Sequence, residues 1–235
     1  MTTISQPLII ALNGSPHRRG NTAALMQWVL EGCEEVGAEV EWLHVIDYEI
    51  NYCQGCFTCL RTGECPIQDD YLSVREMLLA ADGIVVGSPV YGAEPTAQLK
   101  TLLDRLTLLN LYTHTFEGKW SVGVATSGVA PTKGLARRLA GFFGRCCGMI
   151  GAKTTTLAEG YQPLAEVHDA RLPERAGVLG RRLVSEIAHP NRLRWPRLEA
   201  VWHIFLRRFV IRRLILGNTD QFAAVIPIWE EKGWL

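Results

Sequence analysis

Short apolar runs alternate with longer amphipathic stretches along most of this chain, and that alternation constrains the fold more than any other feature. The first run, residues 8–12, is continuously apolar and ends at Asn13-Gly14, as expected for a strand buried on both faces. Further strands are predicted at residues 40–45, 83–87, 121–126 and 153–157. Helical spacing predicts helices at 21–36, 95–106, 132–147 and 171–187, and one more from a cap at Asp69 or Asp70 to about Ala81. Strands that alternate with helices indicate an α/β fold whose parallel sheet is covered on both faces.

Composition indicates a chain with a sizeable core and no nucleic-acid partner. Of the 235 residues, 48% are hydrophobic and 20% are charged, which is enough apolar material for a sizeable core. Because 24 Lys+Arg balance 24 Asp+Glu, the chain has no net positive charge that would attract nucleic acid. No apolar run approaches the roughly 18 residues of a spanning helix, and residues 1–7 lack a basic segment followed by an apolar one. We therefore expect a cytoplasmic protein that is not bound to a membrane.

Residues 14–22, with the sequence GSPHRRGNT, join the first expected strand to the first helix. Such a transition presents free backbone N–H groups at the positive end of the helix dipole, where anions bind. Further donors come from the side chains of Ser15, Arg18 or Arg19, Asn21 and Thr22. The loop fits neither the P-loop pattern nor the G-x-G-x-x-G fingerprint, so it predicts a different cradle for a terminal phosphate. An ordinary capped helix start is the alternative interpretation.

Three short motifs each follow an expected strand. They are G-S-P-x-x-x-G-N-T at 14–22, G-S-P-V-Y-G at 87–92, which is followed by L-K at 99–100 and L-D-R at 103–105, and T-S-G at 126–128. Together they resemble the NAD(P)H-dependent FMN reductases of the flavodoxin-like superfamily, and the first is similar to the FMN-phosphate loop of that family. The resemblance implies a flavodoxin-like, doubly wound five-stranded sheet of order 2-1-3-4-5, with FMN beyond the carboxyl ends of strands one and three.

The resemblance also implies a set of FMN contacts. The cofactor-binding residues that it implies are Ser15, Arg18, Asn21, Thr22, Pro89, Val90, Tyr91, Gly92, Thr126, Ser127 and Gly128. The Tyr91 ring is expected to pack on the isoalloxazine while backbone around Val90 and Gly92 hydrogen-bonds its polar edge; a half-buried loop aromatic is the alternative. Asp104 and Arg105 are expected in a structural ion pair or helix-end contact. No catalytic acid or base is assigned, because in an FMN-dependent oxidoreductase with NAD(P)H as donor the cofactor supplies the chemistry.

Four of the seven cysteines lie within thirteen residues, at Cys53, Cys56, Cys59 and Cys65. Four thiolates are the ligand set of a [4Fe–4S] cluster. The spacing resembles the compact motif of the iron-sulfur flavoproteins, a branch of the same superfamily. One alternative is a zinc site, although structural zinc sites usually combine two short cysteine pairs that lie far apart in the sequence. Another is a set of structural or redox thiols that bind no metal. The odd number of cysteines disfavours a disulfide framework. Since strand two neighbours strand one in the implied sheet, we expect this loop at the same sheet edge as the flavin.

The chain is predicted to have a flavodoxin-like domain at residues 1–189, with a cysteine-rich loop at 51–68, and an extension at 190–235. Between residues 191 and 216 there are seven arginines and one acidic residue, and apolar residues recur at helical spacing. We expect a basic amphipathic helix that serves as an oligomerisation arm in a homodimer or tetramer. Docking of an acidic redox partner such as ferredoxin, and binding to a membrane surface, are alternatives. For the whole protein, the alternatives are a reductase without a cluster and a non-enzymatic redox carrier or sensor.

Overall fold

A five-stranded parallel sheet forms the centre of the protein. The computed structural model describes residues 6–156, 160–161, 169–189 and 206–235. The strands are β1 (Leu8–Asn13), β2 (Glu39–His44), β3 (Gly83–Pro89), β4 (Trp120–Ser127) and β5 (Arg145–Lys153). Their order is β2-β1-β3-β4-β5 with every pair parallel, which confirms the predicted flavodoxin-like sheet. A two-stranded antiparallel sheet of β6 (Thr155–Thr156) and β7 (Gly160–Tyr161) comes after β5.

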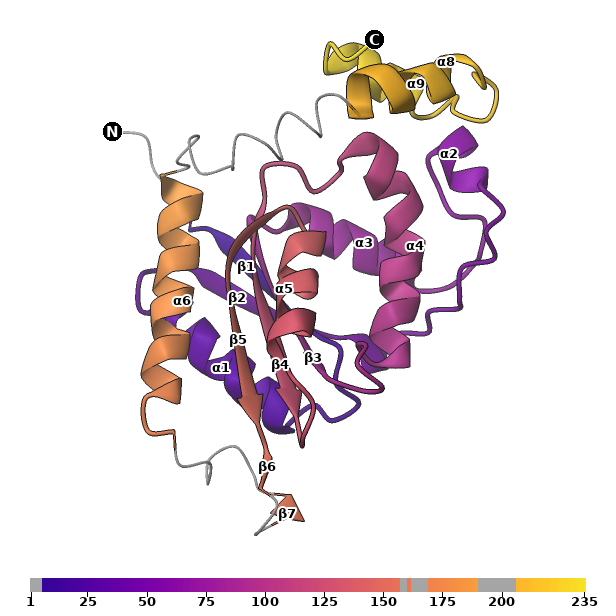
Figure 1. Cartoon of the computed structure of the whole chain (residues 1–235). Coiled ribbons are helices and arrows are strands. Elements are labelled where there is room, and N and C mark those ends of the chain that lie inside the picture. Colours follow the sequence, from indigo (N-terminus) through magenta and orange to yellow (C-terminus); the bar gives the residue numbers. More distant parts are fainter. Residues whose placement is uncertain (1–5, 157–159, 162–168, 190–205) are drawn as a thin grey trace.

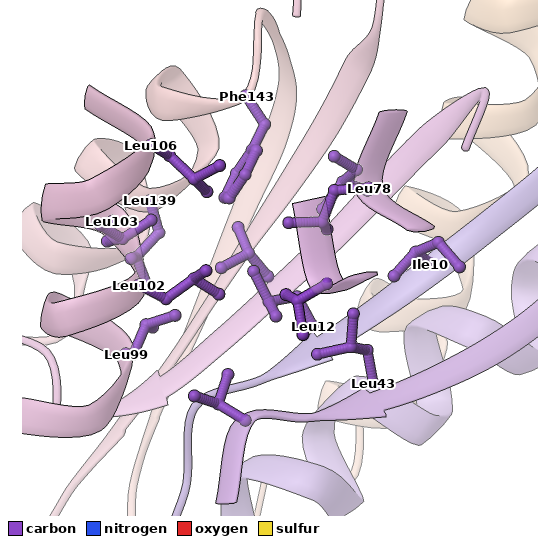
Figure 2. Packing of buried hydrophobic residues seen from close by; sticks show 14 of the residues in the cluster. Ile10, Leu12, Leu43, Leu78, Leu99, Leu102, Leu103, Leu106, Leu139 and Phe143 are labelled. Atoms are coloured by element: carbon purple, nitrogen blue, oxygen red, sulfur yellow. The ribbon is translucent and has the colours of Figure 1, made fainter. Parts of the chain in front are cut away.

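Helices cover both faces of the sheet (Figure 1). Helices α1 (Asn21–Glu34) and α6 (Leu172–Ala188) pack on one face, and α3 (Tyr71–Ala80), α4 (Ala97–Thr113) and α5 (Lys133–Phe142) pack on the other. Because successive side chains of a strand point to opposite faces, Ile9 contributes to the first apolar cluster and Ile10 to the second. Figure 2 shows Ile10 and Leu12 within the second cluster, among leucines of α3 and α4. The continuous apolar run of β1 is thus explained by burial on both faces.

The fifth strand differs from the prediction. Helix α5 ends at Phe142, and the residues expected to continue it to 147 instead begin strand β5 at Arg145. The break is at Gly144, whose φ of +102° suits glycine, and a Cβ there would lie 2.6 Å from the carbonyl oxygen of Phe116. The prediction of a strand at 153–157 was therefore wrong, and Cys146 and Cys147 lie on a strand and not on a helix. Helix α4 also runs further than expected, to Thr113.

The described part of the C-terminal extension packs on the cysteine-bearing segment (Figure 1). The first part of the basic amphipathic helix expected between residues 191 and 216 lies outside the described residues. The later residues form a π-helical turn (Leu206–Ile211), α8 (Arg212–Leu216) and α9 (Ile226–Glu231). These elements meet the short helix α2 (Thr58–Thr62) and the end of α4. The buried members of this apolar cluster are Leu60, Ile215, Phe222, Val225 and Trp229. No helix in the described part of the chain combines the length and the apolar character needed to cross a bilayer.

Candidate functional site

A cavity of about 630 Å³ opens at the carboxyl edge of the sheet, a volume typical of cofactor sites. Its walls come from the loops after β1, β3, β4 and β5, around the point where the strand order reverses. The sheet register brings these loops level, because Asn13 pairs with Gly87 and Pro89 pairs with Thr126. The lining residues are Ser15, His17, Arg19, Gly20, Asn21, Thr22, Pro89, Val90, Tyr91, Thr126, Ser127, Gly128 and Thr154.

The first wall is the loop that leads into helix α1. The Asn13 side chain accepts a hydrogen bond from the backbone N–H of Ser15 at 2.9 Å, and the Ser15 hydroxyl accepts one from the N–H of His17 at 3.1 Å. Gly20 occupies the N-cap of α1, and no side chain caps the helix there. The first N–H groups of the helix are consequently available to an anion at the positive end of its dipole. This local geometry fits a phosphate.

Buried hydroxyl groups form the inner part of the cavity. The Oγ1 atoms of Thr22 on α1 and Thr126 on β4 lie 2.7 Å apart, and both residues are buried. The Ser127 hydroxyl accepts a hydrogen bond from the N–H of Ala130, while its carbonyl accepts one from the N–H of Thr154 at 2.8 Å. These bonds fix the tips of β4 and β5 against α1. The result is a polar, pre-arranged wall beside the helix terminus.

The loop after β3 presents an aromatic ring at the mouth of the cavity. Backbone hydrogen bonds in both directions between Tyr91 and Glu94 close a tight turn, and its two central residues, Gly92 and Ala93, have φ values of +57° and +68°. Two left-handed residues in succession are typical of a type I′ turn. Tyr91 is 53% exposed, so its ring is free to cover a planar ligand.

Nine of the eleven residues predicted for FMN line this cavity, and two do not. Arg18 instead pairs with Asp47 at 2.5 Å, and the wall contains the neighbouring Arg19. Gly92 lies outside the lining and supplies the left-handed backbone that presents Tyr91. The eleven-residue set lacked four lining residues, namely His17, Arg19, Gly20 and Thr154, although Arg19 had been named as the alternative to Arg18. Thr154 was missed because strand β5 was placed too late in the sequence, whereas the other three lie within the loop that the motif had already identified.

A histidine behind the cavity wall is held neutral. His44 Nδ1 lies 3.0 Å from the Asn13 amide nitrogen, and its ring stacks on Trp42. Because the Asn13 oxygen already accepts from Ser15, the Asn13 amide donates to His44. Burial lowers the pKa of His44 below its ordinary value of 6.5, with Asp47 opposing the shift and Arg18 adding to it. Neutral His44 therefore accepts the hydrogen bond that orients Asn13 under the anion loop.

The cysteine loop lies elsewhere, and the expectation that it shares the flavin edge was wrong. It leaves that edge after the 3₁₀ turn η1 (Val45–Asp47) and runs to α2, beside the C-terminal elements (Figure 1). Cys59 packs there with Leu108 and Tyr112 from the far end of α4, whereas Thr96, at the start of α4, donates to the Gly14 carbonyl at the cavity edge. At 1.5 Å per residue, Thr96 and Leu108 are separated by about 18 Å of helix.

The four loop thiols interact electrostatically. None of the seven cysteines forms a disulfide, and the loop members belong to one neighbourhood. Burial raises the pKa of Cys59, and charges on Cys65, Cys53 and Cys56 raise it further. Hydrogen bonds from Thr58 lower the pKa of the exposed Cys56. Cysteines bind iron as thiolates, so an iron-sulfur core would displace the protons of these thiols.

The cysteine loop supplies the donor atoms of an iron-sulfur cluster, and the described positions of these thiols form no site for a single metal ion. Within the described ranges, no three His, Cys, Asp or Glu side chains converge closely enough to hold one metal ion. A zinc site draws its ligands to a point, whereas each thiolate of a [4Fe–4S] cluster binds a different iron atom around a cage. The donor set therefore fits the cluster in number, softness and charge, and no pre-formed zinc site exists among these residues.

Comparison with known proteins agrees with the cavity and the loop. A family model described as NADPH-dependent FMN reductase matches residues 7–162. The chain belongs to this family. An iron-sulfur flavoprotein of Archaeoglobus fulgidus is 30% identical over 230 residues, covering 96% of this chain and 99% of that protein. An iron-sulfur flavoprotein of Methanocaldococcus jannaschii is 43% identical over 97 residues, covering 41% of this chain and 50% of that protein.

Solved structures of other flavodoxin-like proteins share the fold of this FMN reductase family member. A flavone reductase superposes with a TM-score of 0.58 at 17% identity, covering 80% of this chain and 66% of that one. An apo NADH:FMN oxidoreductase superposes with a TM-score of 0.52 at 21% identity, covering 77% of this chain and 90% of that one. At these identities the likeness concerns the fold. Family membership makes the protein an FMN-dependent oxidoreductase.

Proposed function

We propose that this chain is an oxidoreductase of the iron-sulfur flavoprotein type, moving electrons from NAD(P)H or ferredoxin to a small acceptor. The observation that carries the proposal is the presence, in one chain, of a polar cavity at the sheet edge and a separate loop with four cysteines within thirteen residues. When bound, FMN supplies hydride and single-electron chemistry, and a [4Fe–4S] cluster supplies single-electron transfer. Cysteines that form no disulfides are typical of proteins in the reducing cytoplasm, which supports a cytoplasmic location.

The cavity residues divide into two groups with different tasks. Around the start of α1, the backbone N–H groups and the Ser15, Asn21 and Thr22 side chains would hold the FMN phosphate, and Arg19 would add positive charge. At the mouth, the exposed ring of Tyr91 would cover one face of the flavin and exclude water from it.

The cysteine loop would hold the cluster through the thiolates of Cys53, Cys56, Cys59 and Cys65. Within one chain, α4 separates this loop from the cavity. We therefore propose a homodimer or tetramer in which the loop of one chain approaches the cavity of another. The exposed side chains of Tyr52 and Phe57 beside these cysteines are consistent with such a contact.

Anaerobic purification tests the proposal, with an absorption spectrum and analysis of flavin, iron and acid-labile sulfide. We expect one FMN per chain, about four irons and four sulfides, and oxidation of NADH or NADPH with an added acceptor. Cys59→Ala should lose the iron while keeping FMN. The matched control is Cys146→Ala, which removes an exposed thiol outside the loop and should keep both. A folded protein that binds no FMN would contradict the proposal.

The alternative function is an NAD(P)H-dependent FMN or quinone reductase without a cluster. It is favoured by one observation, that the thiols of the described residues do not converge on a single ion-binding point. Bound FMN and NAD(P)H turnover without iron after attempted reconstitution would establish this alternative. Bound cofactors without pyridine nucleotide oxidation would indicate a redox carrier or sensor.

A further inference from the structure

The two ends of the cysteine loop are tied together at its base. The Asp69 carboxylate accepts hydrogen bonds from the backbone N–H groups of Asn51, at 2.9 Å, and Tyr71, at 3.1 Å. The neighbouring Asp70 carboxylate accepts one from the N–H of Glu49 at 2.7 Å. The segment between residues 51 and 69, which contains all four cysteines, is thus a closed loop.

A buried arginine from helix α4 lies in this base. The Arg105 side chain is fully buried, and its Nη1 atom donates to the Asp69 carboxylate and, at 3.3 Å, to the carbonyl of Asn51. Its guanidinium carbon lies 4.1 Å from the centre of the Tyr71 ring, and the Tyr71 hydroxyl donates to the Arg105 carbonyl at 3.0 Å. Arg105 is therefore fixed in position from three sides.

One edge of this guanidinium is unused. The Nε and Nη2 atoms of Arg105 are buried and have no hydrogen-bond partner among the residues that the structure describes. These two nitrogens form the side of the planar group that binds an anion with two parallel N–H donors. Asp69 balances the charge of Arg105, but two buried N–H donors without an acceptor are still unfavourable, so a further hydrogen-bond acceptor is expected at this edge.

The thiols share the neighbourhood of Arg105. Burial raises the pKa of Tyr71 to about 12, the charges of Arg75 and Arg105 act against that rise, and those of Cys65 and Cys59 add to it. Cys65 also packs against the apolar cluster that contains Tyr71. The buried guanidinium thus lies over the Tyr71 ring, and Cys65 packs on the apolar cluster to which that ring belongs. A cluster held by four thiolates carries net negative charge, and reduction adds one more electron to it.

We propose that Arg105 is the buried counter-charge of the cysteine-held cluster and that its free Nε–Nη2 edge serves that negative charge. The inference rests on the proposed function. Arg105 is a positioning and electrostatic residue, since its Nη1 side closes the loop through Asp69 while its other edge stabilises added negative charge. Nearby charge and hydrogen-bond donors set the potentials of iron-sulfur centres, so Arg105 raises the reduction potential of the cluster.

The test is a potentiometric titration of the full-length, anaerobically reconstituted protein, with cluster reduction followed by electron paramagnetic resonance. Arg105→Gln should lower the equilibrium constant for cluster reduction about tenfold, which is about 59 mV for a one-electron couple. Asp69→Asn removes a negative charge from the same pair and should shift the potential in the opposite direction. Arg105→Lys keeps the charge and should stay within about threefold of the wild type.

Two controls separate electrostatics from structure. Asp104→Asn removes an exposed carboxylate, paired with Lys100, from the same helix and should leave the cluster potential unchanged. The FMN potential, measured in the same samples, should stay constant in all variants because the cavity lies beyond the other end of α4. A merely structural role would shift the potential in the same direction in Arg105→Gln and Asp69→Asn, because both changes loosen the loop base.

Equal potentials in Arg105→Gln and the wild type, or shifts of the same sign in Arg105→Gln and Asp69→Asn, overturn the proposal. If Arg105→Gln loses its cluster, the cluster potentials of Asp69→Asn and Arg105→Lys decide. The proposal is supported if the reduction potential rises in Asp69→Asn and stays near the wild-type value in Arg105→Lys. Any other pair of potentials overturns it. A wild-type protein that binds FMN but takes up no iron and sulfide overturns both this inference and the cluster part of the proposed function. Failure in the variants of a loaded protein overturns this inference alone.

Discussion

Replacement of Trp229 by alanine should release the C-terminal elements from helix α2, which carries Cys59, without unfolding the sheet. Trp229 is fully buried in the apolar cluster that contains Leu60 of α2, and its Nε1 atom donates to the Tyr112 carbonyl at 2.6 Å. Loss of a buried tryptophan costs about 3–5 kcal/mol, and loss of the hydrogen bond adds about 1 kcal/mol. Among the described residues the cluster has five buried members, so a loss of this size is comparable with its local stability.

Hydrogen exchange measured by mass spectrometry reports this opening segment by segment. For a local destabilisation of about 4 kcal/mol, exchange in residues 206–235 and 58–63 should accelerate by about 10³-fold in Trp229→Ala, while β1, β3 and β4 keep their protection. Residues 58–63 are included because the Ala224 N–H donates to the Leu60 carbonyl. Leu216→Ala, which truncates a 46% exposed side chain in the same segment, is the matched control and should change stability by less than about 0.5 kcal/mol. Faster exchange confined to 206–235 would refute the reasoning, because α2 would then hold its position without the C-terminal elements.

The cavity and the sheet lead to three more expected outcomes. Thr22→Val should weaken FMN binding about tenfold or more in a fluorescence titration. The reason is that a hydrogen bond from the Thr22 hydroxyl to the charged phosphate is worth about 1.5–3 kcal/mol. The control Thr107→Val, on α4, should bind FMN as the wild type does. Since burial lowers the pKa of His44, the unfolded chain binds a proton more readily, so the His44 contribution to the free energy of unfolding is complete above about pH 6.5 and falls below it. Urea unfolding between pH 5 and 8 should show that slope, and His44→Gln should reduce it. Gly123→Ala should leave little folded protein in a solubility and circular-dichroism assay, since its Cβ would lie 1.8 Å from the Ala136 carbonyl oxygen; well-folded Gly123→Ala would contradict the packing of α5 on β4.

The sequence was sufficient for the parts of the structure that depend on local pattern. The apolar run of β1 and the polar residues directly after it predict both a buried strand and an anion loop, because the same strand end begins both. The motifs after β3 and β4 lie at equivalent strand ends, so parallel pairing brings them to one edge without further information. Gly144 shows where local pattern failed: the apolar spacing on its two sides is continuous with a helix, and a single left-handed residue ends that helix.

Other parts of the site depend on contacts between residues far apart in the sequence. Whether Arg18 or Arg19 faces the cavity depends on Asp47, which lies beyond the next strand and pairs with Arg18. The position of the cysteine loop depends on contacts with α4 and with the C-terminal elements, and cysteine spacing carries no information about either. Arg105 was expected in a structural ion pair, but spacing did not identify Asp69 as its partner across 36 residues.

The position of the cysteine loop has a consequence for how electrons move. Its base is held by the buried Arg105–Asp69 pair, its helix α2 packs on the far end of α4, and the C-terminal elements cover Leu60. These contacts hold the loop away from the flavin cavity of the same chain. Movement of the cysteines toward that cavity would break a buried ion pair and an apolar cluster together, at a cost of several kcal/mol. For the proposed cluster and FMN, direct electron exchange is therefore expected to require a second chain. Turnover that passes through the cluster should then depend on protein concentration in the range where the oligomer dissociates, whereas NAD(P)H oxidation that uses FMN alone should not.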